Sequence, residues 1–114
     1  MNIPLMDLKA QYKQIQGEIQ EAINKVLEST NYIMGTEVYE FEKEFAQYCD
    51  AKFCCSVANG TDALIIALKA LGLKSGERVL TVANTFIASA ECITHAGGIP
   101  DFIDIDPVTY LIDV

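Results

Sequence analysis

In the first part of the chain, apolar side chains recur at steps of three and four residues, which is the spacing of one face of an α-helix. The first such pattern spans Asp7 to Ser29, with apolar positions at Leu8, Tyr12, Ile15, Ile19, Ile23 and Val26. Asp7 stands at its start and is predicted to cap the helix. After a turn at 31–35, a second helical pattern begins near Thr36. We expect it to bury Val38, Phe41, Phe45 and Tyr48.

After Asp50 the pattern changes to short apolar runs separated by turns. The runs that predict strands lie at 53–57, 78–82 and 101–105. The helical stretches between them lie at 63–71, ending at Gly72, and at 85–96. Strands that alternate with helices are parallel, and near-continuous apolar strands are typical of a sheet covered on both faces. The sequence therefore predicts an α/β fold, in which two leading helices precede a βαβαβ unit with parallel strands.

The charge balance narrows the possible partners. The 114 residues include 16 acidic and 8 basic side chains, which gives a net charge of −8. A duplex-binding protein needs a basic face, so we expect no nucleic-acid partner. The start of the chain lacks the basic and apolar regions of a signal peptide, and its apolar runs are too short to span a bilayer. These features predict a cytoplasmic protein without a membrane partner.

The four cysteines are Cys49, Cys54, Cys55 and Cys92. Their spacing contains no pair of C-x-x-C units, and the adjacent residues Cys54 and Cys55 would point to opposite faces of a strand. We therefore expect buried free thiols, and no metal site.

Ligands of parallel α/β sheets collect at the carboxyl ends of the strands, where the next helix begins. This rule singles out residues 58–62 and 83–86. In the first segment, Gly60 allows a ligand to approach the main chain. The N–H groups of Thr61 and Asp62 would lie at the positive end of a helix dipole, where phosphate is favoured. A simple helix cap formed by Thr61 or Asp62, without any ligand, is the commoner role of such residues.

Three further features have two interpretations each. An aromatic residue such as Phe86 at a strand end is either part of the core or a cover for a flat heterocycle. Asp104 and Asp106 resemble the D-x-D motif of haloacid-dehalogenase-like phosphatases, whose partner motifs would have to lie downstream, whereas Asp106-Pro107 favours a strand-end turn. His95 is the single histidine, and we expect it on the surface near a helix end rather than in catalysis.

Several stretches, taken in order, resemble one enzyme family. They lie at 3–8, 32–35, 41–45, 57–64, 85–88, 97–100 and 102–106. Together they are similar to the DegT/StrS-type sugar aminotransferases, a branch of the fold-type-I pyridoxal phosphate enzymes. The resemblance implies that residues 1–114 are the N-terminal part of the cofactor-binding large domain. It also implies a parent protein that transfers an amino group, usually from glutamate, to a keto-sugar nucleotide. Such enzymes are homodimers with shared active sites.

The resemblance also assigns residues to the cofactor, pyridoxal 5′-phosphate, and to the substrate. The residues implied in phosphate binding are Gly60, Thr61 and Asp62, through their main-chain N–H groups. Phe86 would stack on the pyridine ring. The residues implied near the sugar-nucleotide entrance are Tyr32, Met34 and Gly35. One departure is Ala83, where the family often has proline, which would only stiffen the turn.

The residues that complete the reaction are not expected in this chain. Family members use a later lysine to hold the cofactor and a later aspartate beside the pyridine nitrogen. Lys69, within a predicted helix, and Lys74, in the following loop, are no substitutes. The chain therefore contains no catalytic residue by this reading, and alone it is expected to be an inactive fragment.

Three alternatives stay open. One is another fold-type-I enzyme, such as a cysteine desulfurase or a threonine-aldolase-like lyase. A second is a relative without the lysine, acting as a dehydratase or a regulator. The third is a non-enzymatic flavodoxin-like binding module, although such a module would begin with a strand.

Overall fold

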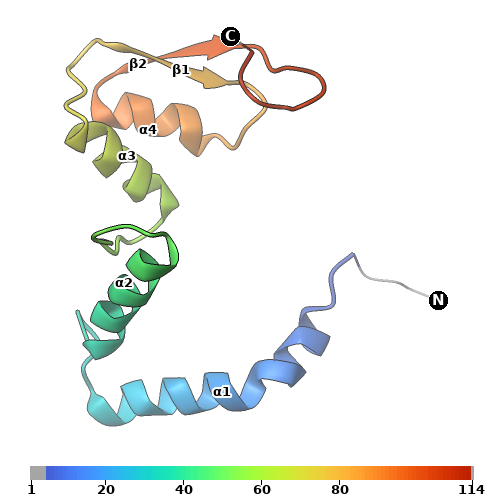
Figure 1. Ribbon diagram of the computed structural model, residues 1–114, viewed down its shortest axis with the longest axis vertical. Helices are drawn as coiled ribbons and strands as arrows, with labels where there is room; N and C mark the ends of the chain where they lie inside the picture. The colour runs from blue at the N-terminus through green and yellow to red at the C-terminus, as the bar shows by residue number, and fades with distance from the viewer. Residues whose placement is uncertain (1–4, 114) are drawn as a thin grey trace. The chain divides into compact units, whose positions relative to one another are not determined.

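The computed structural model describes residues 5–113 (Figure 1). Residues 3 and 4, which belong to the family-like stretch 3–8, lie outside this part. The elements in chain order are α1 (Leu8–Ser29), α2 (Thr36–Tyr48), α3 (Gly60–Ala70), β1 (Arg78–Val82), α4 (Ala88–Ala96) and β2 (Ile99–Ile103). The chain divides into two compact units, the first ending at Ser56 and the second beginning at Val57.

Both predicted leading helices are confirmed in the first unit. The Asp7 carboxylate accepts a hydrogen bond from the Ala10 N–H at 3.0 Å, which is the predicted cap of α1. At its other end, Thr30 takes a left-handed conformation with φ of 54°. The second helix begins at Thr36, as predicted. Local periodicity and capping were therefore sufficient to predict both helices.

The predicted burial in α2 is wrong for its aromatic side chains. Phe41, Phe45 and Tyr48 are exposed, whereas Val38 is half-buried and Ala46 is the buried residue of this helix. The rings contact one another instead, with centroid distances of 5.5 Å between Phe41 and Phe45 and 6.3 Å between Phe45 and Tyr48. Helical periodicity identified the apolar face correctly, but the described residues of the first unit leave that face exposed.

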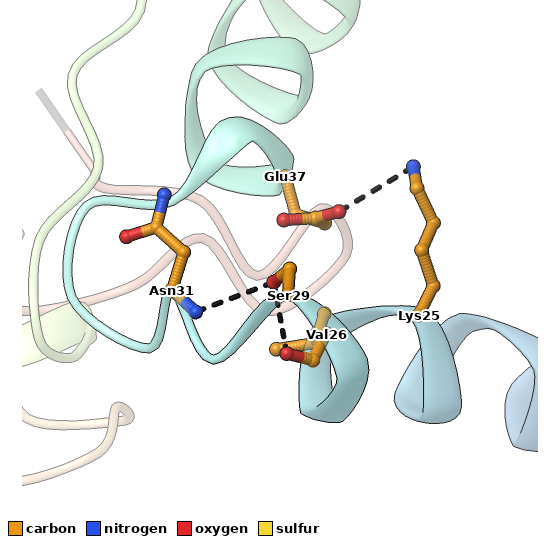
Figure 2. Close-up of polar contacts among 5 residues, drawn as sticks. All are labelled: Lys25, Val26, Ser29, Asn31 and Glu37. Atoms are coloured by element: carbon orange, nitrogen blue, oxygen red, sulfur yellow. Dashed lines mark hydrogen bonds and ion pairs between the residues drawn. The ribbon is translucent and has the colours of Figure 1, made fainter.

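The connection between α1 and α2 is a tight turn held by local polar contacts (Figure 2). The Ser29 hydroxyl donates to the Val26 carbonyl at 2.9 Å and accepts from the Asn31 N–H at 3.3 Å. Lys25 and Glu37 form an ion pair at 3.4 Å between the two helices. Because this ion pair is exposed to solvent, its contribution to the stability of the turn is small. The turn is therefore defined mainly by the hydrogen bonds around Ser29.

The second unit contains a parallel pair of strands joined by α4. β1 pairs with β2 from Arg78 opposite Ile99 to Val82 opposite Ile103. α4 packs on both strands and on α3 (Figure 1), and its buried side chains are Ala88, Cys92 and Ile93. The parallel α/β arrangement predicted from the sequence is confirmed. The described residues cover one face of the sheet only, because Leu80 and Phe102 are exposed.

The strand predicted at 53–57 is wrong. A strand needs a neighbour to accept and donate its main-chain hydrogen bonds, and no described residue pairs with this segment. The Ser56 N–H donates instead to the Glu42 carboxylate at 2.7 Å. Other predicted boundaries moved by two or three residues. The helix predicted at 63–71 begins at Gly60, the one predicted at 85–96 begins at Ala88, and the strand predicted at 101–105 is Ile99–Ile103.

The thiols differ in exposure. Cys92 is buried, as expected, but Cys49 and Cys55 are exposed and Cys54 is half-buried; all four are free. The expectation of buried thiols is therefore wrong for Cys49 and Cys55, which lie outside the helix and strand cores. Among residues 5–113 no cluster of His, Cys, Asp or Glu could hold a metal ion. No helix in this range is long and apolar enough to cross a bilayer.

The acidic side chains around β2 serve local structure. Asp101 accepts two hydrogen bonds from the Arg78 guanidinium on the neighbouring strand, and these bonds lower the pKa of Asp101. One oxygen of Asp106 accepts hydrogen bonds from the Val108 N–H at 2.9 Å and from the N–H and hydroxyl of Thr109 at 2.6 and 2.9 Å. These bonds confirm the predicted turn at 106–107 and give the Asp106 carboxylate a structural role.

Adding a Cβ at Gly98 is expected to destabilise the second unit. That atom would lie 3.0 Å from side-chain carbons of Ile93 and Leu73 and 3.1 Å from the Glu77 carbonyl oxygen. Overpacking of this kind costs about 1–3 kcal/mol, so Gly98→Ala should lower the free energy of unfolding by that amount, measured by chemical denaturation. The matched control is Gly17→Ala in the interior of α1, where an added Cβ would meet no atom within 4 Å. It should raise stability by about 0.5–1 kcal/mol. Equal effects of the two substitutions would contradict this account of Gly98.

The Asp106 turn should make stability depend on pH in the acid range. Hydrogen bonds from the Thr109 main chain, the Thr109 hydroxyl and the Val108 main chain hold the pKa of Asp106 below its ordinary 3.8. The unfolded chain therefore binds this proton first as the pH falls. The stabilisation is fully present above the ordinary pKa, and it is lost as the pH falls through the lower pKa of the folded state. In Asp106→Asn, the free energy of unfolding should no longer contain this pH-dependent stabilisation. Thr109→Ala keeps both main-chain donors and should retain most of it.

Candidate functional site

The start of α3 is fixed by a mutual contact between Asn59 and Asp62. Asn59 is extended, with φ of −163° and ψ of 173°. Its side-chain oxygen accepts from the Asp62 N–H at 2.9 Å, while its amide nitrogen donates to the Asp62 carboxylate at 2.9 Å. The helix cap expected in this turn is therefore present, but Asn59 provides it rather than Thr61 or Asp62. Asparagine at this position is among the best N-caps because its short side chain reaches the first-turn amides.

Two main-chain N–H groups of this turn stay open. No residue of the described chain accepts a hydrogen bond from the amide of Gly60 or Thr61. Both amides belong to the first turn of α3, where the helix dipole favours negative charge. Of the three amides predicted to bind phosphate, Asp62 already has a protein acceptor, which leaves Gly60 and Thr61 as the available donors.

A hollow of about 500 Å³ opens beside these amides. It is lined by Gly60, Thr61, Leu64, Phe86, Ala88 and Ser89. The lining therefore brings together the start of α3 and the segment that leads from β1 into α4. The sequence analysis expected ligands at the carboxyl ends of strands. Residues 83–86 meet this expectation, because they come directly after β1.

Phe86 is not a core residue. Its side chain is 74% exposed, and it stands two residues before the first residue of α4. Within residues 5–113, Phe86 is therefore not buried as a strand-end aromatic, and it lines the hollow instead. An exposed aromatic face beside open N–H donors suits a ligand with a flat ring and an anionic group.

The predicted substrate residues Tyr32, Met34 and Gly35 belong to the first unit. The Tyr32 hydroxyl donates to the Leu27 carbonyl at 3.4 Å, and its ring lines a separate hollow of about 320 Å³ beside α1. Met34 is exposed and has a positive φ of 50°. Gly35 is buried, and a Cβ there would lie 2.5 Å from the Asn31 carbonyl oxygen. The turn itself thus requires this glycine, and a role in substrate binding stays a prediction.

The charged residues considered for catalysis lie away from the hollow's lining. His95 is in the last turn of α4, exposed, with its Nε2 3.5 Å from Glu91, so its expected surface role is confirmed. Lys69 lies in the last turn of α3, and Lys74 lies in the following loop. Neither lysine lines the hollow.

Comparison with known proteins decides the family. The model of the DegT/DnrJ/EryC1/StrS aminotransferase family matches residues 13–114. The chain belongs to this family. This membership confirms the resemblance expressed by the sequence stretches and excludes a flavodoxin-like module. It also excludes the desulfurase and aldolase alternatives.

Two similar proteins show how much of the chain is shared. A pleiotropic regulatory protein of Geobacillus stearothermophilus is 44% identical over 99% of this chain and 30% of its own length. A dTDP-3-amino-3,6-dideoxy-alpha-D-galactopyranose transaminase of Aneurinibacillus thermoaerophilus is 46% identical over 97% of this chain and 31% of its own length. The chain therefore spans about a third of the length of these relatives.

A solved structure with 30% sequence identity has the same fold over nearly the whole chain. NtdA from Bacillus subtilis, crystallised with bound cofactor PMP, superposes with a TM-score of 0.91 and 30% identity. The match covers 98% of this chain and 26% of the NtdA chain. The fold described above is therefore that of the corresponding part of a fold-type-I aminotransferase.

Sequence reasoning missed Asn59, Leu64 and Ser89. Asn59 had a detectable signal, because an asparagine three residues before an acidic residue at a helix start is a typical cap. Leu64 follows from helical spacing once the start of α3 is known. Ser89 had no signal of its own, since its place in the hollow depends on where α4 begins.

Removing the α3 cap should destabilise the second unit. Asn59→Ala deletes the acceptor of the Asp62 N–H, at a cost of about 1 kcal/mol in the free energy of unfolding. Asn59→Ser keeps a capping oxygen and should stay close to wild type. Urea denaturation of the three proteins measures this, and equal stabilities of the alanine and serine variants would contradict the role of the cap.

Proposed function

We propose that this chain is the N-terminal part of the large domain of a pyridoxal 5′-phosphate-dependent aminotransferase that acts on a keto-sugar nucleotide. The observation that carries the proposal is the pair of open Gly60 and Thr61 amides beside the exposed Phe86 ring, in a chain of this family. Two features support the cofactor and the substrate class. NtdA binds PMP, the amino form of the same cofactor, and a relative 46% identical is named a sugar-nucleotide transaminase.

The geometry of the hollow fits the phosphate of the cofactor. A phosphate dianion needs several donors and a favourable field, and the first turn of α3 supplies both without a cationic side chain. The lining contains no charged side chain, so the main chain is the source of attraction there. Gly60 leaves room for close approach, because a Cβ added at this position would meet no atom within 4 Å.

Phe86 fits the ring of the cofactor. An exposed aromatic face stacks on a flat heterocycle and excludes water from that side, which fixes the ring orientation. When bound, the cofactor supplies the electron sink for amino-group transfer. The contribution of this chain is therefore to bind the phosphate through Gly60 and Thr61 and to orient the ring with Phe86. Asp62 is the remaining residue predicted to bind the cofactor, and Asn59 holds its carboxylate at the start of α3.

The remaining roles belong to the proposal as well. The lysine that holds the cofactor and the acidic partner of its ring nitrogen would come from sequence beyond these 114 residues. Tyr32, Met34 and Gly35 are proposed to contact the sugar nucleotide. Glutamate is the proposed amino donor, and a cytoplasmic homodimer with shared sites is the proposed form of the parent protein.

A regulatory role is the second candidate. The relative named a pleiotropic regulatory protein is 44% identical over 99% of the chain, almost the same similarity as the transaminase. Both candidates share the proposed cofactor site, so cofactor binding does not separate them. Amino transfer from glutamate to a keto-sugar nucleotide, measured on the purified full-length protein, does; cofactor binding without any transfer would favour the regulatory candidate.

Gly60→Pro tests the proposed phosphate contact directly. Proline lacks the N–H, yet it is well tolerated at the first position of a helix, and the extended conformation of Asn59 is the one that a following proline requires. In the full-length protein we expect roughly tenfold or weaker binding of pyridoxal phosphate, since a hydrogen bond to a charged group contributes about 1.5–3 kcal/mol. The melting temperature without cofactor should change little.

Gly60→Ala is the matched control, because it adds a side chain but keeps the N–H group. It should bind the cofactor much more tightly than the proline variant in the same absorbance titration. If both variants bind the cofactor as wild type does, the Gly60 amide does not contact the phosphate. If the wild-type protein binds no pyridoxal phosphate, the proposed function is wrong.

A further inference from the structure

The position of the Phe86 ring is not set by packing. The side chain is 74% exposed, and the neighbouring Ile87 is 67% exposed. The ring–ring contacts found among residues 5–113 all lie in α2, and neither they nor the cation–π contact of Lys52 with Phe53 includes Phe86. For a side chain this exposed, the main chain sets the direction of the Cα–Cβ bond and so limits the positions that the ring can reach. The conformation of the segment between β1 and α4 therefore determines where this ring stands.

Hydrogen bonds close that segment around Phe86. The Thr85 N–H donates to the Ala83 carbonyl at 3.0 Å, and the Ser89 N–H donates to the Phe86 carbonyl at 3.0 Å. In addition, the side-chain hydroxyls of Thr85 and Ser89 are hydrogen-bonded at 2.9 Å. Phe86 thus lies inside a short loop of chain whose two ends are joined by a hydroxyl pair.

The hydroxyl pair ties an exposed segment to a buried one. Thr85 is exposed, whereas Ser89 is half-buried and lines the hollow. The Ser89 carbonyl also accepts from the thiol of Cys92 at 3.4 Å, and Cys92 is 4% exposed in the core of the second unit. Ser89 is therefore anchored, and Thr85 is held by it. The pair is not a side-chain cap of α4, because the N-cap residue Ile87 makes no side-chain hydrogen bond.

We propose that Thr85 and Ser89 are positioning residues that hold Phe86 ready for the ring of the cofactor. This inference rests on the proposed function. A binding group fixed before the ligand arrives pays less conformational entropy on binding, so the ligand binds more tightly. Without the hydroxyl pair, the segment at 83–87 samples more conformations and the exposed ring leaves its stacking position for part of the time.

The experiment uses the full-length protein and pyridoxal 5′-phosphate itself as the probe. The variants are Thr85→Val and Ser89→Ala, and the readouts are the dissociation constant and the induced circular dichroism of the bound cofactor, which reports ring orientation. Loss of one neutral hydrogen bond predicts roughly three- to tenfold weaker binding, with an altered dichroism signal. Ser89→Thr keeps the hydroxyl and should restore both readouts. Thr94→Val, which removes a hydroxyl from the same helix, is the matched control and should behave as wild type.

A double variant tests whether the two hydroxyls act as a pair. If they do, Thr85→Val combined with Ser89→Ala weakens binding about as much as either change alone. Additive losses would overturn the pair. Wild-type dissociation constants and dichroism in both single variants would also overturn it, even if thermal stability fell, and would leave the proposed function intact. Absence of cofactor binding by the wild-type protein would remove the proposed function first. Should Ser89→Ala fail to fold, the exposed Thr85→Val provides the same test.

Discussion

Parallel pairing of two consecutive strands is the constraint on which the second unit depends. Two neighbouring parallel strands cannot be joined by a tight turn. The chain must therefore cross over and return to the end of the sheet at which the first strand began. α4 makes this crossover and buries Ala88, Cys92 and Ile93 as it does so. The crossover must begin directly after β1, which places the segment with Phe86 at the carboxyl end of that strand. The hollow beside α3 is a consequence of this arrangement, because α3 packs against the same helix.

Few elements of the described chain pack against one another, and this determines which apolar side chains are exposed. Among residues 5–113, the buried apolar side chains are Ala46, Ala88, Cys92 and Ile93. The apolar face of α1 and the aromatic face of α2 remain exposed, as does one face of the two-stranded sheet. Helices and strands of this kind are stabilised mainly by burying such faces. The large exposed apolar area is consistent with a chain that spans about 30% of the length of its relatives.

Local chemistry in the sequence was sufficient for the helices and for the parallel order of elements. Asp7 and Thr36 marked helix starts correctly because capping and periodicity are local properties. The failures have one physical origin, since each concerned a property that depends on distant partners. Residues 53–57 have the composition of a strand but no neighbour to pair with, and the rings of α2 have the spacing of a core but no cover. Of the residues that line the hollow, the sequence had singled out Gly60, Thr61 and Phe86, whereas Ser89 could be recognised only from the observed start of α4.

The four free thiols differ in a way that makes the protein suitable for chemical labelling. Cys49 and Cys55 are exposed in the first unit, whereas Cys92 is buried between α4 and its neighbours in the second. An alkylating reagent reaches exposed thiols directly, but it reaches a buried one only when the surrounding structure opens. The rate at which Cys92 is alkylated thus reports transient opening of the core that supports the hollow, while Cys49 and Cys55 give the rate for an unprotected thiol on the same molecule.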